Sequence, residues 1–392
     1  MNRILTINSG SSSIKFSLYH MGKSETLSLS GIIERIGLKP TIFKINDVEG
    51  QTMLEDNQYL RNHNVAFKTL FDWLKRNSPD QEIDAVGHRI VHGGTKFRRP
   101  HNITPELIET LNELTPLAPD HLPHEIKGVM AISKIYPGLN QVACFDTAFH
   151  RHLPQRAKMF ALPRNLFTEG IMRYGFHGLS YEYIMQELMD VAGEKYARGR
   201  VIIAHLGSGA SMVAVKDGKS MDTTMGFTPT GGLVMGTRSG DLDPGILIYL
   251  LRKKGMSPSS LNHLLNVYSG LLGVSGRSSD MKFLLDNETK SVDIAEAIYL
   301  FCYQAKKFIG ALCTVLGGLD TLIFTGGIGE NSPAIRKRIC EDMTFLNIHL
   351  DPTRNESNEP IISCDGVLTT VRVIKTNEEL MIARHTNNLV SK

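Results

Sequence analysis

Two glycine- and serine-rich turns in this sequence have the composition of phosphate-binding loops. The first lies within 3–18 and the second within 200–215, and each is followed by a Gly-Lys-Ser bend, at 22–24 and 218–220. In both copies an apolar segment leads into the turn and a second apolar segment follows it. Backbone N–H groups and hydroxyls in such turns can surround phosphate oxygens without bulky side chains in the way. The repeat therefore predicts two related β-hairpins that hold a nucleotide's phosphate chain from both sides of a cleft.

Two arginines are flanked by glycines and hydroxyl-bearing residues. Arg89 lies within Gly-His-Arg-Ile-Val-His-Gly-Gly, and Arg238 lies within Gly-Thr-Arg-Ser-Gly-Asp. A guanidinium group offers a planar fork of donors that matches a carboxylate or a phosphate. The two histidines around Arg89 suggest a metal site, but the glycines that follow argue against the helix needed to align them. We therefore expect both arginines to bind anions.

Two further residues have positions that are compatible with either a structural or a chemical role. Asp146 follows an apolar segment, so it is either a helix cap or a carboxylate of the cleft. His177 lies between aromatic residues and glycines, where a buried core histidine and a catalytic histidine are equally compatible with the sequence. His124, His150 and His152 are expected to be surface or capping residues.

A third glycine-rich segment, 325–331, follows a predicted strand and precedes a predicted helix. Strand, glycine turn and helix N-terminus in that order favour an anion or nucleotide site. The two Gly-Lys-Ser bends are not P-loops, because Ser17 and Val213 occupy the positions of the required upstream glycine. No Gly-x-Gly-x-x-Gly opens a helix after a strand, which excludes the dinucleotide fingerprint.

Bulk properties limit the remaining classes. A chain of 392 residues is long enough for two domains or at most three. The net charge of +3 is too small to indicate a nucleic-acid or membrane-surface protein. No signal peptide and no membrane helix is expected. The five cysteines are odd in number and scattered, which is typical of reduced thiols in a cytoplasmic enzyme.

Strands and helices alternate in the same order in both halves, which predicts an α/β protein with two related domains. The first half is expected to contain strands near 4–7, 14–18, 41–45, 83–86 and 141–145, and helices near 64–76 and 104–114. The second half is expected to contain strands near 201–204, 212–215, 321–324 and 371–374, and helices near 291–316, 333–342 and 378–386. An irregular stretch at 153–163 predicts domains 1–147 plus 380–392 and 148–379.

Together, these motifs resemble the acetate kinase family, which belongs to a larger group with sugar kinases, Hsp70 and actin. Seven motifs occur in the family's order over nearly the whole chain, at 8–15, 87–94, 145–150, 173–178, 235–245, 327–332 and 376–380. The resemblance implies a duplicated ribonuclease H-like fold with the active site in the interdomain cleft. It assigns the acyl substrate to the N-terminal domain and the nucleotide to the C-terminal domain.

The resemblance also implies a reaction, namely reversible transfer of a phosphoryl group from ATP to acetate, giving acetyl phosphate and ADP. It implies Mg²⁺ or Mn²⁺ as cofactor and a homodimer, with no nucleic-acid or membrane partner. The implied catalytic residues are Asp146, His177 and Arg238. The implied acyl-substrate residues are Arg89, Val91, His121, Phe176 and Pro229.

The remaining implied site residues bind the metal ion and the nucleotide. Asn8 and Glu378 match the magnesium positions of the family. The nucleotide is assigned to Lys15, His205, Leu206, Gly207, Ser208, Gly209, Asp280, Met281, Lys282, Gly327, Ile328, Gly329, Glu330 and Asn331. A carboxylic acid with a pKa of about 4–5 is already ionised at neutral pH, so its attack on phosphorus needs charge shielding and no general base. Asp146 is therefore expected to orient an arginine or a metal-bound water.

The sequence departs from the family pattern at several positions. Asp120 stands where an apolar residue usually faces the acyl methyl group, which leaves the acyl chain length open. The other departures are Leu179, Tyr181, Ser208, Thr230-Gly231 and Lys282. A propionate or butyrate kinase therefore remains an alternative. A pyrophosphate-dependent kinase is disfavoured by 327–331, and an actin- or Hsp70-like ATPase by Arg89 and Arg238.

Overall fold

The computed structural model describes residues 2–77 and 82–391. The chain forms two compact units, Met1–Ala148 with Asn377–Lys392, and Phe149–Thr376. The chain therefore returns to the first unit between residues 376 and 377, whereas the sequence predicted that it returns between 379 and 380. Helix α16 (Glu378–Val390) accounts for the difference, because it packs on strands of the first unit from its first turn onward. Among the described residues, no helix combines the length and the apolar character needed to cross a bilayer.

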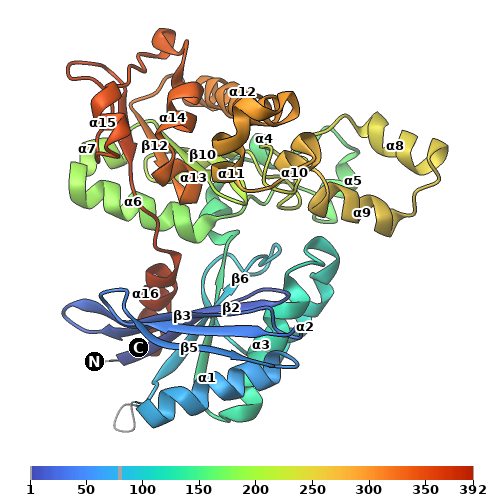
Figure 1. Ribbon diagram of the computed structural model, residues 1–392, viewed down its shortest axis with the longest axis vertical. Coiled ribbons are helices and arrows are strands. Elements are labelled where there is room, and N and C mark those ends of the chain that lie inside the picture. Colours follow the sequence, from blue (N-terminus) through green and yellow to red (C-terminus); the bar gives the residue numbers. More distant parts are fainter. Residues whose placement is uncertain (1, 78–81, 392) are drawn as a thin grey trace. The chain divides into compact units, whose positions relative to one another are not determined.

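The first unit is built on an eight-stranded sheet (Figure 1). Its strands are β1 (Asn2–Ser9), β2 (Ser13–Met21), β3 (Glu25–Glu34), β4 (Thr41–Asn46), β5 (Thr52–Gln58), β6 (Ala85–Ile90), β7 (His101–Asn102) and β8 (Asn140–Phe145). Their order is β5-β4-β3-β2-β1-β6-β8-β7. The hairpin β1–β2 is antiparallel, whereas β1–β6 and β6–β8 are parallel, so β1, β6 and β8 end at the same edge.

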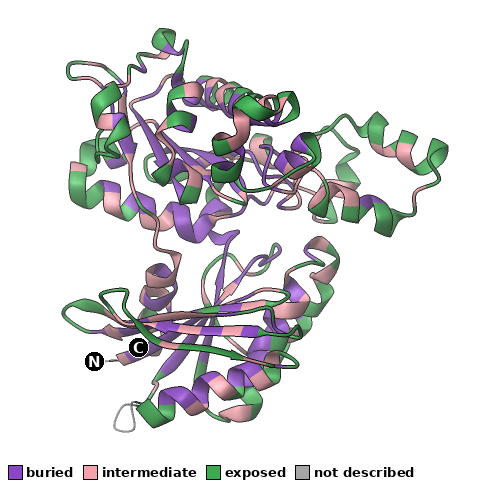
Figure 2. Cartoon of the chain, viewed as in Figure 1, coloured by how far each residue is buried: buried purple, intermediate pink, exposed green. Residues whose placement is uncertain are grey.

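Helices cover both faces of this sheet. Side chains of a strand point alternately to its two faces. Leu5 and Ile7 of β1 therefore pack in the cluster that includes α1 (His63–Asn77) and α3 (Leu122–Ile135), whereas Ile4 packs with Ala383 of α16. Gly87 of β6 permits a close approach of α16, because a Cβ there would lie 2.3 Å from Thr386 Oγ1. The purple strands of Figure 2 show how completely this sheet is buried near its centre.

The second unit has a five-stranded sheet with the same mixture of pairings. Its strands are β9 (Val201–Leu206), β10 (Ala210–Lys216), β11 (Lys219–Thr223), β12 (Thr321–Thr325) and β13 (Thr370–Val373), in the order β11-β10-β9-β12-β13. The hairpin β9–β10 is antiparallel, and β9–β12 and β12–β13 are parallel. Helix α6 (Gly178–Ala192) packs on Val201 and Ile203, and the long helix α12 (Val292–Leu316) packs against β9, β10 and β11.

Shorter helices complete the two units. They are α2 (Pro105–Glu113), η1 (Thr115–Leu117), η2 (Ala148–His152), α4 (Gln155–Lys158), α5 (Arg164–Thr168), α7 (Glu194–Ala197), α8 (Pro244–Lys253), α9 (Pro258–Val267), α10 (Gly270–Ser275), α11 (Met281–Asn287), η3 (Glu288–Lys290), α13 (Gly326–Asn331), α14 (Pro333–Cys340), η4 (Thr344–Leu346) and α15 (Pro352–Glu356).

The two predicted hairpins and the predicted α/β class are confirmed. Other elements differ from expectation. Helix α3 falls between the expected helix near 104–114 and the expected strand near 141–145, in a stretch for which no element was predicted. Pro123 lies in the first turn of α3, where a missing N–H and a fixed φ are well tolerated. The expected glycine turn at 325–331 contains the short helix α13, and the expected irregular stretch at 153–163 contains α4.

Candidate active site

Arg89 and Asp146 form the central ion pair of the first unit. Strands β6 and β8 are parallel neighbours, so Arg89 near the end of β6 lies beside Asp146, which directly follows β8. The Arg89 Nε lies 3.1 Å from Asp146 Oδ1, and its Nη2 lies 2.5 Å from Oδ2. The Asp146 N–H donates to the Ile90 carbonyl at 3.0 Å. Because the Asp146 side chain is only 1% exposed, this bidentate contact fixes the plane of the guanidinium group.

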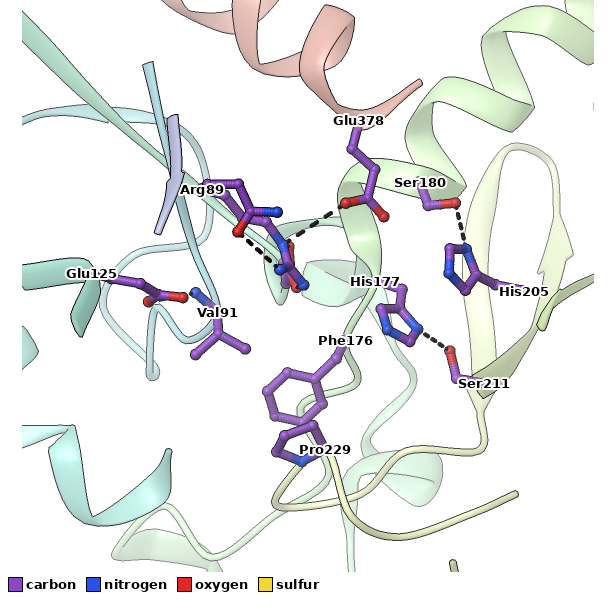
Figure 3. Close-up of polar contacts among 12 residues, drawn as sticks. Arg89, Val91, Glu125, Phe176, His177, Ser180, His205, Ser211, Pro229 and Glu378 are labelled. Carbon is purple, nitrogen blue, oxygen red and sulfur yellow. Dashed lines mark hydrogen bonds and ion pairs between the residues drawn. The ribbon is translucent and has the colours of Figure 1, made fainter. Parts of the chain in front are cut away.

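Three more predicted site residues gather around this pair. Asn8 Oδ1 lies 3.4 Å from Arg89 Nη1. Glu378 Oε2 lies 3.8 Å from Arg89 Nε (Figure 3). Lys15 faces Asn8 across the β1–β2 hairpin and acts electrostatically on Glu378. Burial alone lowers the pKa of Arg89, but Asp146 and Glu378 outweigh it and raise that pKa above its ordinary value. The first unit therefore brings Asn8, Lys15, Arg89, Asp146 and Glu378 together.

The Asn8 and Glu378 side chains fit the role of magnesium ligands in their donor chemistry. Both offer oxygen atoms, which Mg²⁺ prefers. Burial raises the pKa of Glu378, and the neighbouring Asp146 carboxylate raises it further, against the opposing effects of Arg89 and Lys15. A divalent cation would offset this concentration of negative charge. In the part of the chain that the structure describes, no cluster of three or more His, Cys, Asp or Glu side chains forms a closed metal cage.

The predicted acyl residues Val91 and His121 also belong to the first unit. Val91 directly follows β6 and is 2% exposed, and its N–H donates to the Glu125 carboxylate at 3.0 Å. His121 is the residue that precedes helix α3. Asp120 is exposed and acts on His124, so its carboxylate is directed to the surface. Glu125 was not predicted as a site residue. It lies in a helix that was itself not expected, and a single acidic residue carries no sequence signal of its own.

The second unit assembles the predicted nucleotide segments. Strands β9 and β12 are parallel, with His205 opposite Thr325, so the turn after β9 lies beside the start of α13. Gly326 has φ 76°, and a Cβ there would lie 2.8 Å from the Leu206 carbonyl oxygen, so only glycine suits this position. The Gly236 N–H donates to the Ser208 carbonyl at 3.0 Å. Asp280 caps α11 by accepting from the Phe283 N–H at 2.7 Å.

The predicted nucleotide residues differ in their solvent exposure. The buried ones can only support the backbone of these segments, whereas the exposed ones are available to a ligand. Leu206, Gly329 and Met281 are buried and support the segments. Gly207, Gly209, His205 and Ile328 are partly exposed, and Ser208, Asp280, Lys282, Gly327 and Asn331 are exposed. The Glu330 carboxylate accepts from the N–H groups of Gly326 at 2.8 Å and Thr376 at 3.0 Å. The Glu330 side chain thus holds α13 to the end of the second unit.

His177 and Arg238 meet at the second glycine turn. A Cβ built on Gly209 would lie 3.3 Å from His177 Nε2 and 3.6 Å from Arg238 Nη1. Arg238 Nη1 donates to the Pro229 carbonyl at 3.0 Å, which directs the guanidinium toward this turn. The absence of a side chain at Gly209 leaves space where both groups can approach a phosphate. The implied roles of His177 and Arg238 as catalytic residues are consistent with this geometry.

A chain of hydroxyl groups orients His177. His177 Nδ1 contacts Ser211 Oγ at 2.9 Å (Figure 3). Ser211 Oγ also contacts the hydroxyl of the buried Tyr181. The His177 ring stacks on His205 with centroids 4.4 Å apart, and His205 Nδ1 contacts Ser180 Oγ at 2.8 Å. Because Nδ1 is engaged with Ser211, Nε2 is the nitrogen directed at Gly209. Ser180 and Ser211 were missed by the sequence analysis, although Ser211 lies within the repeated motif.

His150 was expected to be a surface or capping residue, and that expectation is wrong. It is 2% exposed, with Nδ1 at 2.9 Å from Ser220 Oγ and Nε2 at 3.0 Å from the Phe176 carbonyl. Burial lowers its pKa to about 4, so it stays neutral and anchors the backbone just before His177. Phe176 is 1% exposed and Pro229 is buried in this second unit, whereas Val91 belongs to the first.

Comparisons with known proteins place the chain in a family. Residues 3–384 match the acetokinase family. An acetate kinase of Rhodopseudomonas palustris is 47% identical over 390 residues, covering 97% of each chain. The crystal structure of Porphyromonas gingivalis acetate kinase matches with a TM-score of 0.90 at 40% identity, covering 100% of both chains. A propionate kinase structure from Francisella tularensis matches with a TM-score of 0.94 at 37% identity, covering 99% of this chain and 100% of that one.

These matches extend over nearly the whole length of each relative. The predicted fold class, the duplicated α/β fold of acetate and sugar kinases, Hsp70 and actin, is confirmed by the structural neighbours. The predicted cleft location of the site stays a prediction. The motifs, the fold and the matched length lead to one conclusion: the chain belongs to the acetokinase family.

Proposed function

We propose that this chain catalyses the reversible, ATP-dependent phosphorylation of acetate to acetyl phosphate. The observation that carries the proposal is the guanidinium of Arg89, fixed by the bidentate contact with Asp146. Among the described residues, its Nη1 makes one long contact, to Asn8, so the edge of the guanidinium that does not face Asp146 is the one offered to an anion. A carboxylate is the anion that such a fork binds in a planar geometry.

The chemistry follows from charge. Acetate is ionised at neutral pH, and its oxygen attacks the terminal phosphorus of ATP without a proton transfer. The main obstacle is repulsion between the acid and the polyphosphate, and the transferring group spreads its charge over three equatorial oxygens. Arg89 binds the acid, Arg238 and His177 stabilise the equatorial oxygens, and Asp146 orients Arg89. When bound by Asn8 and Glu378, Mg²⁺ or Mn²⁺ supplies further charge neutralisation at the phosphates.

The test is product trapping with hydroxylamine. We expect a hydroxamate that forms only when acid, ATP and a divalent metal are all present. Omission of each component in turn separates the possibilities: ATP turnover without any acid would support an ATPase of the actin or Hsp70 kind, and release of pyrophosphate from acetyl phosphate and phosphate would support the pyrophosphate-dependent alternative. Either result would contradict the proposal.

Propionate is the second candidate substrate, because a propionate kinase of known structure superimposes with a TM-score of 0.94. Val91, Phe176 and Pro229 are the apolar residues assigned to the acyl group, and all three are buried. The same hydroxamate assay with acids of two to four carbons ranks the substrates. We expect kcat/KM to be highest for acetate, and a preference for butyrate would exclude the acetate assignment.

We also propose that the protein is a cytoplasmic homodimer. Helix α8 has no buried residue and exposes several large apolar side chains, namely Ile246, Ile248, Tyr249 and Leu251. A surface of this kind on one helix favours burial against a second copy. Light scattering is expected to give a mass of about twice 43.5 kDa, and a monomeric mass would contradict the dimer. The cysteines are free, four of them buried, which supports a reducing compartment.

A further inference from the structure

Glu125 is a buried acid with a single short contact to the segment that carries the acyl-site residues. It lies one turn into helix α3 and is 3% exposed. Its Oε2 accepts from the Val91 N–H at 3.0 Å, and Figure 3 shows the carboxylate directed at that nitrogen. Val91 is two residues beyond Arg89. The backbone of 89–93 is thus held from one side by Glu125 and from the other by Asp146 and Thr147, the latter accepting from the Gly93 N–H at 3.2 Å.

The charges around this segment make the protonation state of Glu125 important. The charged groups that act on its carboxyl are Arg89 from β6 and Asp146 after β8. His124, the neighbour of Glu125 on helix α3, stacks on His63 of α1. With Glu125 neutral, the carboxylates of Asp146 and Glu378 are matched by Arg89 and Lys15. Ionised Glu125 would add one unmatched negative charge close to the guanidinium that must bind an anionic substrate.

We propose that Glu125 is a positioning residue of the acyl site, which in its protonated form holds Val91 and leaves Arg89 able to bind the substrate carboxylate, and which weakens that binding when it ionises. This inference rests on the proposed function. It adds a pH-dependent affinity for the acid to a reaction that needs no proton transfer. Burial raises the pKa of Glu125 to about 8, and Asp146 adds to this, whereas the Val91 N–H and Arg89 lower it. Glu125 is therefore mostly protonated at neutral pH.

The kinetic test compares wild type with Glu125→Gln between pH 7 and pH 9. Glutamine retains an acceptor for the Val91 N–H but cannot ionise. We expect the KM for acetate of the wild type to rise about five- to tenfold over this range, and that of Glu125→Gln to change less than about twofold. The KM for ATP is expected to be unaffected. Glu125→Ala removes the acceptor, so its KM for acetate is expected to be about tenfold higher at every pH. The control is Glu113→Gln, an exposed acid of α2.

A stability measurement tests the buried acid without relying on activity. An acid whose pKa is raised by folding destabilises the native state increasingly as pH rises from its unfolded value, near 4.5, to its folded value. The apparent Tm of wild type should therefore fall relative to that of Glu125→Gln between pH 5 and pH 8, and the difference should level off above pH 8. A difference that does not vary with pH would overturn the protonated state of Glu125.

The outcomes separate this inference from the proposed function. If wild type forms no hydroxamate with any acid, the proposed function fails, whereas the Tm comparison still reports on Glu125. If hydroxamate forms and wild type and Glu125→Gln show the same pH dependence of the KM for acetate, the proposal for Glu125 is overturned while the enzyme activity stands.

Discussion

Replacing Arg238 by alanine is expected to lower kcat for acyl phosphate formation by about 10³-fold or more, with little change in either KM. The guanidinium is held at the Gly209 turn by its contact with the Pro229 carbonyl. Charge on the transferring phosphoryl group is stabilised there most strongly in the transition state, when the group is bonded to neither oxygen fully. A group that acts mainly on the transition state changes kcat more than substrate binding.

The experiment is a steady-state comparison of wild type, Arg238→Ala and Arg198→Ala. Arg198 is an exposed arginine of the same unit, with a 2.8 Å ion pair to Glu194 on the surface. Its replacement is expected to leave kcat within about twofold, since surface ion pairs contribute little. A large increase in the KM for ATP with unchanged kcat would instead assign Arg238 to ground-state binding of the nucleotide, and would contradict the transition-state role.

Sequence patterns correctly predicted those parts of the fold in which residues close in sequence are also close in space. The two hairpins are examples, because each turn and both of its strands lie within one short segment. Helix α3 was not predicted, because prolines at 116, 119 and 123 interrupt the apolar pattern, although a proline in a first turn is compatible with a helix. Glu125 was missed for the same reason, since its burial depends on the packing of that helix against β6.

Only long-range structure shows where the two ambiguous residues lie. Asp146 was equally compatible with a helix cap and a cleft carboxylate, and its ion pair with Arg89 depends on the parallel pairing of β6 with β8. His177 was equally compatible with the core, and its left-handed φ of 57° and its stacking on His205 now place Nε2 at the Gly209 turn. Pairings between distant strands are not encoded in any single segment, so sequence patterns left both questions open.

The Asp146 carboxylate is expected to act through Arg89, and a double-mutant cycle provides the test. Arg89→Ala should lower kcat/KM for acetate by about 10³-fold, because the acid loses its binding fork and Asp146 and Glu378 lose their buried counter-charge. Asp146→Ala should cost about 10²-fold, since Arg89 remains but is no longer fixed. If Asp146 only orients Arg89, the double variant should be no worse than Arg89→Ala, a strongly non-additive result.

A second bidentate pair provides the matched control. Arg200 contacts Asp320 with Nη2 2.5 Å from Oδ1, and both side chains are 36% exposed. The same cycle on Arg200 and Asp320 is expected to change kcat/KM by less than about twofold, because the pair joins strand ends away from the glycine turns. If instead the losses from Arg89→Ala and Asp146→Ala multiply, Asp146 must have a partner other than Arg89 in the reaction.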